Sequence, residues 1–166
     1  MLMRSPLARD RRQPPGFIRP CKPVLSLRVP IGPEWIHELK HDGFKIVANK
    51  DGDVVRLWSR NGRDWSAEFV AITAAVIALP FARIVLDGEA VAAARKGNAL
   101  LGPHGCASAC LYAFDLLRLG GPLALSERRA LLRKHLRKAA PALIYSEHME
   151  SQDAEAMFRH ACAMGA

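Results

Sequence analysis

A lysine that could act as a nucleophile lies in the stretch Glu38-Leu39-Lys40-His41-Asp42-Gly43-Phe44-Lys45. On a strand, Glu38 and Lys40 would share a face, because alternate residues point the same way. The Asp42-Gly43 pair that follows is typical of a hairpin turn, since glycine accepts a positive φ without steric cost. The sequence thus predicts that Lys40 is held against a sheet at the mouth of a turn. Desolvated there, it could attack an electrophile; the alternative is a solvated lysine before an ordinary turn.

Further residues that could bind a ligand or take part in catalysis follow along the chain. A guanidinium such as that of Arg60 suits bidentate contacts to phosphate, although it could equally be a surface charge at a strand end. Glu89 could accept hydrogen bonds from a hydroxyl, or it could be a turn residue. Phe114 could be a stacking platform, but a phenylalanine in an apolar strand is more often part of the core. These residues lie in Ser59-Arg60, Leu86-Asp87-Gly88-Glu89 and Ala113-Phe114-Asp115-Leu116-Leu117.

Three alternating segments surround the lysine and are expected to form an antiparallel meander. They are Trp35–Lys40, Phe44–Lys50 and Val54–Arg60, with turns at Asp42-Gly43 and Asp51-Gly52. The meander would place the lysine between two hydrogen-bonded strands.

The rest of the chain alternates between helical and extended patterns. In the helix over 125–139, Leu125, Leu132, Leu136 and Ala139 form the apolar stripe. Arg129, Arg133 and Arg137 lie on one flank, which we interpret as a solvated face. In the strand over 111–117, Tyr112, Phe114 and Leu116 would share one side. The expected elements are a helix over Glu68–Leu79 ended by Pro80, a strand over Arg83–Ala92, a loop over Ala93–Ser108, a strand over Leu111–Leu117, a helix over Leu125–Ala139, a short strand over Ala142–Ser146 and a helix over Asp153–Ala163.

Composition favours a polyanionic partner. The chain has 24 Lys and Arg against 16 Asp and Glu, a formal charge of +8 and a pI near 9.8. No segment has the length of a membrane span, and four cysteines without a paired framework fit a reducing cytoplasm. We expect a flexible basic arm at 1–16, an extended segment at 17–33 that runs over the domain surface, and one domain over 17–166.

The motifs occur in the order seen in ATP-dependent DNA ligases. The chain resembles their adenylation domain, most of all the ligase domain of bacterial non-homologous end-joining ligases, from about Phe17 to Gly165. The resemblance implies an α+β nucleotidyltransferase fold of the ligase and capping-enzyme type, ATP-grasp-like, with antiparallel β-sheets flanked by helices. It also implies DNA nick sealing in repair or recombination, in a bacterial, nucleoid-associated cytoplasmic protein.

The resemblance also implies roles for single residues. Lys40 matches the lysine that attacks the α-phosphorus of ATP, and Mg²⁺ would neutralise charge on the phosphates. Glu89 matches the carboxylate that holds the ribose hydroxyl or supports the metal, and Phe114 matches the aromatic that stacks on adenine. The remaining nucleotide-binding positions are Glu38, Lys45, Ser59 and Arg60, with Glu38 near the adenine edge.

Two departures from the family pattern bear on activity. Lys45 stands where the family usually has arginine, which keeps the charge but loses the fork geometry. Family members also continue beyond the stretch that ends this chain, with a Glu-Gly strand, a Lys-x-Lys pair and an OB-fold. We therefore expect a domain incomplete at its C-terminal end, weak or inactive alone on nicked or broken double-stranded DNA, unless a separate chain supplies the missing parts. The alternatives are a non-catalytic nucleic-acid-binding remnant and an RNA ligase or capping-type nucleotidyltransferase.

Overall fold

The computed structural model describes residues 14, 16–21, 23–24, 26, 28–92, 108–119, 122–150 and, near the end, 156, 158, 159 and 163. The strands are β1 (Ile36–Glu38), β2 (Phe44–Asp51), β3 (Val54–Ser59), β4 (Arg83–Ala92), β5 (Ala109–Arg118), β6 (Leu143–Tyr145) and β7 (His148–Glu150), and the helices are α1 (Val70–Ile77) and α3 (Leu125–Leu136). The predicted arm at 1–16 and loop at 93–108 lie almost entirely outside the described residues. Of the predicted last helix, the four described residues are helical.

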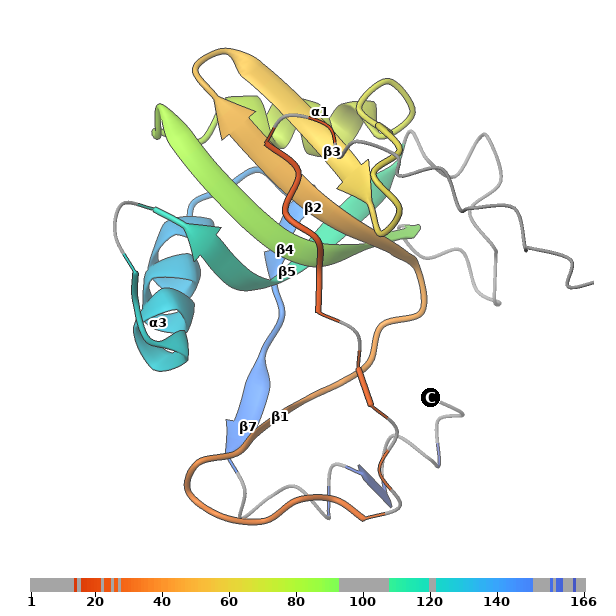
Figure 1. Ribbon diagram of the computed structural model, residues 1–166, viewed down its shortest axis with the longest axis vertical. Coiled ribbons are helices and arrows are strands. Elements are labelled where there is room, and N and C mark those ends of the chain that lie inside the picture. Colours follow the sequence, from red (N-terminus) through yellow and green to blue (C-terminus); the bar gives the residue numbers. More distant parts are fainter. Residues whose placement is uncertain are drawn as a thin grey trace, which may run out of the picture.

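The strands form two sheets (Figure 1). Five strands make the main sheet in the order β3-β2-β4-β5-β6, and β1 pairs with β7 in a small separate sheet. The expectation of antiparallel sheets is wrong in one respect, because β6 runs parallel to β5 and makes the main sheet mixed. The connection from β5 to β6 passes through α3, the type of crossover that parallel neighbours require.

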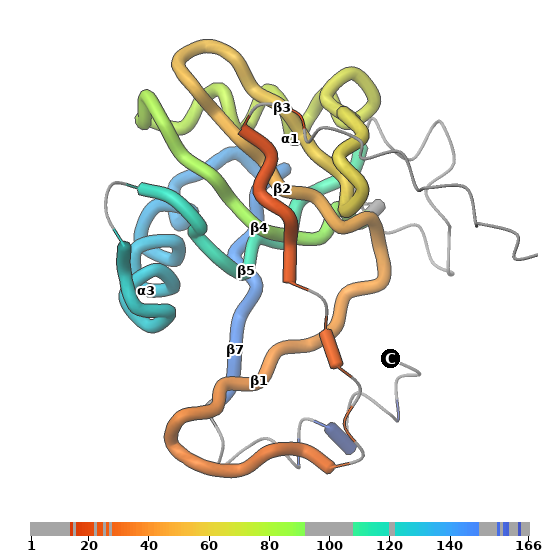
Figure 2. Tube along the Cα trace, in the orientation of Figure 1, coloured from red at the N-terminus to blue at the C-terminus, as the bar shows by residue number. Residues whose placement is uncertain are grey.

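The predicted three-strand meander is also wrong. β1 pairs with β7, and β2 pairs with β3 and β4. The chain from β1 climbs from the small sheet to the main sheet before β2 begins (Figure 2). Asp42-Gly43 therefore makes no hairpin, and the φ of Gly43 is not positive, whereas Asp51-Gly52 does make the predicted turn, with φ 61° at Gly52.

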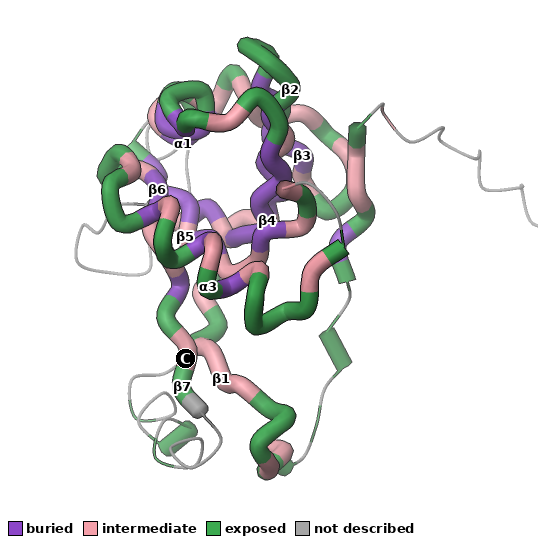
Figure 3. Tube along the Cα trace, turned by 90° about the vertical axis from the view of Figure 1, so that its left-hand side faces the viewer, coloured by how far each residue is buried: buried purple, intermediate pink, exposed green. Residues whose placement is uncertain are grey.

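One face of the main sheet carries the core. Ile46, Ala48, Leu86 and Leu111 are fully buried on this face. The same cluster includes Ile72 and Val76 of α1 and Leu132 and Leu136 of α3, so both helices cover this side. Buried stretches accordingly lie in β2, β4, β5 and α1 (Figure 3). None of the described helices is both long and apolar enough to cross a membrane.

A β-bulge in β5 decides where its aromatic side chains point. Asp87 pairs with Asp115 and Gly88 with Ala113, so Phe114 has no register partner on β4. The extra residue reverses the alternation, and Leu116 is buried in the core while Phe114 stays half-exposed. The prediction that Phe114 and Leu116 share one side is therefore wrong.

Lys50 is a buried cation that ties the sheet to α1. It is 7 % exposed, and its Nζ donates to the carbonyls of Ile77 and Leu79, both at 2.6 Å, at the C-terminal end of α1. A cation is favourable there because the helix dipole and the free carbonyls are both negative. We expect Lys50→Met to lower the free energy of unfolding by about 1–3 kcal/mol, because it leaves two carbonyls without a partner. Urea denaturation measures this loss.

Arg83→Met is the matched control for Lys50→Met. Arg83 pairs with Asp51 at 2.8 Å, but both side chains are mostly exposed. Its removal should change the free energy of unfolding by less than about 1 kcal/mol. Equal losses in the two variants would show that the contacts of Lys50 to α1 contribute nothing beyond a surface charge.

Candidate functional site

The face of the main sheet opposite the core carries a row of polar and aromatic side chains. Lys45 of β2 pairs in register with Glu89 of β4, and Glu89 pairs with Tyr112 of β5. Because directly opposed residues project from the same face, these three side chains lie side by side. Asp87, two residues before Glu89 on the same strand, lies on this face too.

Glu89 lies at the centre of a cluster of positive charges. Burial raises the pKa of its carboxyl group, and the charges of Lys45, Lys40 and Arg60 act in the opposite direction, as does a hydrogen bond from the Gly43 amide. Three of the cations predicted for the site therefore act on one carboxylate. A polyanion entering here would meet all three.

Lys45 lies between a carboxylate and an aromatic ring. Its side chain is nearly buried and forms an ion pair with Asp87, and its Nζ lies 4.0 Å from the centroid of the Phe114 ring. Burial raises the pKa of Asp87, and Lys45 opposes that effect. The ammonium thus covers one face of the ring predicted to stack on a base.

Lys40 is exposed, contrary to the expectation of a desolvated lysine held against the sheet. Its side chain is 82 % exposed and pairs with Asp42. The cause is the pairing of β1 with β7, which leaves Lys40 in the open connection to β2. The adjacent His41 does pack inward, with its ring stacked on Tyr112 at 4.1 Å between centroids, and burial lowers its pKa.

Ser59 and Arg60 are neighbours in the chain but differ in their surroundings. Ser59 pairs in register with the core residue Ile46, and therefore faces the side of the sheet away from Lys45. Its Oγ accepts a hydrogen bond from the Arg63 amide at 3.1 Å. Arg60 is exposed in the turn after β3, near enough for its charge to act on Glu89. The structure thus brings Arg60, and not Ser59, to the charge cluster.

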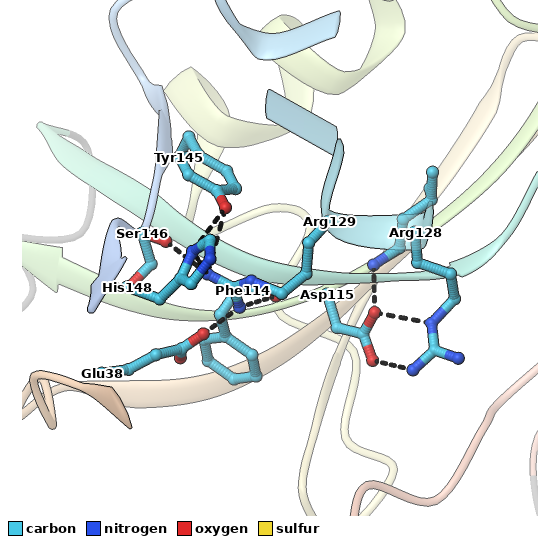
Figure 4. A network of polar contacts seen from close by, with 9 residues as sticks. Glu38, Phe114, Asp115, Arg128, Arg129, Tyr145, Ser146 and His148 are labelled. Atoms are coloured by element: carbon cyan, nitrogen blue, oxygen red, sulfur yellow. Dashed lines mark hydrogen bonds and ion pairs between the residues drawn. The ribbon is translucent and has the colours of Figure 1, made fainter. Parts of the chain in front are cut away.

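Glu38 reaches the site from the small sheet. It forms an ion pair with Arg129 of α3, which also contacts the Phe114 carbonyl (Figure 4). Burial raises the pKa of Glu38, and Arg129 opposes this. Beside this network, Arg128 holds both carboxylate oxygens of Asp115, at 2.8 and 2.9 Å.

Sequence reasoning missed two features of the site. The first is the stack of His41 on Tyr112, which has no local signal because the two residues are far apart in the chain. The second is the burial of Arg129, and here a signal exists. Arg129 stands four residues after Leu125 and three before Leu132, which places it on the apolar stripe of its helix.

A divalent cation would find limited support from protein groups alone. No group of three or more His, Cys, Asp or Glu side chains suited to a metal occurs in the described parts of the chain. Mg²⁺, however, keeps several waters and binds through one or two carboxylates together with substrate phosphates. The half-buried Glu89 carboxylate could be a protein ligand of a metal that arrives with a phosphate group, whose negative charge would offset repulsion from the cations nearby.

The charge state of Glu89 gives a pH-dependent prediction. The folded-state pKa lies above the ordinary value of 4.5, so the ionised carboxylate lowers stability at neutral pH. That loss vanishes as the pH falls through the folded pKa, because the folded state then binds the proton more readily than the unfolded state. We expect Glu89→Gln, which can still accept from the Gly43 amide, to raise the melting temperature at neutral pH. The difference should shrink in mildly acidic buffer.

Glu147→Gln provides the comparison for Glu89→Gln. Glu147 is exposed and lies 3.7 Å from Arg133. Its replacement should leave the melting temperature nearly unchanged at both pH values. A lower melting temperature for Glu89→Gln at neutral pH would contradict the assigned direction.

Comparison with known proteins points in one direction. The family described as "ATP dependent DNA ligase domain" matches residues 20–166. The multifunctional non-homologous end joining protein LigD of Pseudomonas aeruginosa is 32 % identical over 164 residues, which cover 91 % of this chain and 19 % of that protein. DNA ligase C of Mycobacterium tuberculosis is 37 % identical over 132 residues, covering 68 % of this chain and 37 % of that protein.

Solved structures show the same likeness. The ligase domain of LigD from M. tuberculosis superposes with a TM-score of 0.57 at 30 % identity, covering 76 % of this chain and 44 % of that chain. A mycobacterial DNA ligase D complexed with ATP and MES gives a TM-score of 0.58 at 28 % identity, covering 76 % and 44 %. The chain thus spans less than half of each of these relatives.

Proposed function

The chain belongs to the ATP-dependent DNA ligase family, and from that premise we propose that it binds ATP and forms a covalent lysyl–AMP intermediate at Lys40. The observation that carries the proposal is the row of Lys45, Glu89 and Tyr112 on one sheet face, with the Lys45 ammonium 4.0 Å from the centroid of the Phe114 ring. This row lies on the same sheet face as Phe114. Phosphates and a base could therefore be held side by side.

In the proposed reaction the neutral amine of Lys40 attacks the α-phosphorus of ATP. A bond forms between Nζ and phosphorus, and the bond from that phosphorus to the oxygen bridging to the β-phosphate breaks. Pyrophosphate leaves with the electron pair of that bond, and the amine proton passes to solvent. In the free chain Lys40 pairs with Asp42, so ATP must draw the lysine away from this exposed partner.

The other residues of the site would bind and orient the nucleotide. Phe114 offers the ring face for adenine, and the Lys45 ammonium, now over that ring, would move toward phosphate. Glu89 would hold the ribose hydroxyl or support Mg²⁺, which supplies charge neutralisation at the phosphates. Arg60 would contact phosphate. Glu38 would border the adenine edge, and Ser59 would contribute through the turn that it closes with Arg63.

We further propose that the adenylated chain serves nick sealing on double-stranded DNA. That reaction needs more groups than these, and the relatives of this chain are much longer. Segments of the kind the family carries elsewhere, including an OB-fold, would have to act on the same DNA from this or another chain. An RNA ligase, a capping-type enzyme and a non-catalytic nucleic-acid-binding protein are the competing functions.

The test is incubation of the protein with Mg²⁺ and ATP or GTP labelled at the α-phosphate. We expect acid-labile labelling by ATP and little by GTP. Preferential labelling by GTP would favour a capping-type enzyme. Salt-sensitive DNA binding without any covalent label would favour a non-catalytic binding protein.

A further inference from the structure

The guanidinium of Arg129 is buried at the junction of the two sheets. The residue is 4 % exposed, whereas Arg133 and Arg137, four and eight residues further on, are exposed. The predicted solvated flank of three arginines is therefore wrong at its first member. A buried guanidinium is strongly unfavourable unless its donors are paired, so its contacts indicate a specific role.

Arg129 binds groups from both sheets (Figure 4). Its Nη1 donates to the Glu38 carboxylate and, at 2.7 Å, to the Phe114 carbonyl. Glu38 belongs to β1 of the small sheet and Phe114 to β5 of the main sheet. A single nitrogen thus joins the two sheets at the residues expected to border and stack on adenine.

The second nitrogen anchors the guanidinium to the segment from β6 to β7. Nη2 donates to the Ser146 carbonyl at 2.9 Å and contacts the Tyr145 hydroxyl at 3.2 Å and His148 Nδ1 at 3.1 Å. Nη2 has two hydrogens for these three neighbours, and the Tyr145 hydroxyl also lies 3.0 Å from His148 Nδ1, so the three groups form one shared network around the nitrogen. The fork of the guanidinium is therefore held in one orientation by β6 and the start of β7.

Because of the bulge in β5, the contact of Arg129 to the Phe114 carbonyl helps to set the position of Phe114. Phe114 has no register partner on β4, so the sheet ladder alone does not set its backbone. Arg129 supplies a donor to its carbonyl and so helps to fix the direction of the aromatic ring. Glu38 differs, because it pairs in register with His148 within the small sheet, and its ion pair with Arg129 links it to the main sheet.

We propose that Arg129 is a positioning residue of the nucleotide site, which holds the Glu38 side chain and the Phe114 ring in the arrangement that binds adenine. This proposal rests on the proposed function. Arg129 does not touch the nucleotide, and acts through these two residues. A lysine in its place keeps the charge but lacks the planar fork, and cannot reach the same acceptors together.

The test compares Arg129→Lys with Arg133→Met in the full chain, measuring the rate of covalent AMP formation against ATP concentration. Arg133 is an exposed arginine one turn further along α3 and serves as the control. We expect Arg129→Lys to raise KM for ATP at least about tenfold and to lower the maximal rate less, while Arg133→Met leaves both unchanged. A lower melting temperature with an unchanged KM would assign Arg129 to stability alone and overturn the proposal.

Two further measurements keep the result decisive. Tyr145→Phe removes one hydrogen-bond partner of the guanidinium with little loss of volume, and it should raise KM by a smaller factor than Arg129→Lys. This variant replaces Arg129→Lys in the test if Arg129→Lys does not fold. An unchanged KM in Tyr145→Phe would then count against the proposal. The ¹⁹F resonance of fluorophenylalanine at position 114, identified by its loss in Phe114→Leu, needs no activity. It should shift in Arg129→Lys, or in Tyr145→Phe, and not in Arg133→Met. Absence of labelling in the wild type would refute the proposed function, and an unmoved resonance would refute the role of Arg129.

Discussion

Replacing Lys40 by arginine is expected to abolish covalent labelling by ATP, a loss of at least about a thousandfold. Arginine keeps the positive charge and can still pair with Asp42, but it is not deprotonated in proteins and so cannot supply the attacking amine. Because the Lys40 side chain is mostly exposed, the free energy of unfolding should change by less than about 0.5 kcal/mol. Labelling with α-phosphate-labelled ATP, alongside urea denaturation, separates the two effects.

Lys45→Arg is the control for this prediction. Lys45 is the neighbouring lysine of the site, paired with Asp87 beside Phe114, and arginine at this position keeps the positive charge. It should retain labelling. Labelling that persists in Lys40→Arg and disappears in Lys45→Arg would show that the nucleophile is Lys45 and not Lys40.

Gly43→Ala is expected to lower the free energy of unfolding by about 3 kcal/mol, the upper part of the usual range for an overpacked site. A Cβ at position 43 would lie 2.2 Å from the Ala90 carbonyl oxygen, and 3.2 Å from Cγ of Glu89. The obstructing group is backbone of the neighbouring strand β4, so β2 would have to move away from it. Gly43→Asn should cause a similar loss, and both variants should lose ATP labelling because the Gly43 amide bonds to Glu89.

Gly52, in the turn between β2 and β3, offers the opposite case. Its φ is 61°, and a Cβ at this position would have no atom within 4 Å. Glycine is therefore favoured here by the backbone conformation and not by lack of space. Gly52→Asn should be tolerated and Gly52→Ala should lose about 1–2 kcal/mol, because asparagine adopts this conformation more readily. If Gly43→Asn proves as mild as Gly52→Asn, the close approach of β2 and β4 at Gly43 is wrong.

The predictions from local pattern agree with the structure where one segment carries the whole signal. The strands at Phe44–Asp51, Val54–Ser59 and Arg83–Ala92 lie where alternation predicts them. The turn at Asp51-Gly52 and the end of α1 before Pro80 also follow local rules. α1 is shorter than predicted, since it begins at Val70 after a turn over Trp65–Phe69. Such signals work because side-chain period and backbone preference act over a few residues.

The sequence predicts the candidate residues by their type and their order along the chain, but not how they are arranged in space. Asp87 and Glu89 share a sheet face, as the alternation within β4 indicates, and Lys45 joins them because β2 pairs with β4. Their convergence with Lys40 and Arg60 depends on which strands pair, and no single segment carries that information. Ser59 shows the limit, because its strand position turns it toward Ile46 and the core side.

By itself, the sequence determined the family, the principal strands and the buried stripe of the first helix, and it named the candidate site residues as a prediction. Only the tertiary structure decided that β1 leaves the sheet to pair with β7, that a bulge sends Phe114 and Leu116 to opposite faces, and that Arg129 is buried. The exposure of Lys40 follows from the first of these and the environment of Glu38 from the first and third. The physical reason is common to all three. Strand pairing, register shifts and the burial of a charge are settled by contacts between segments far apart in the chain, and their free energies are absent from any local pattern.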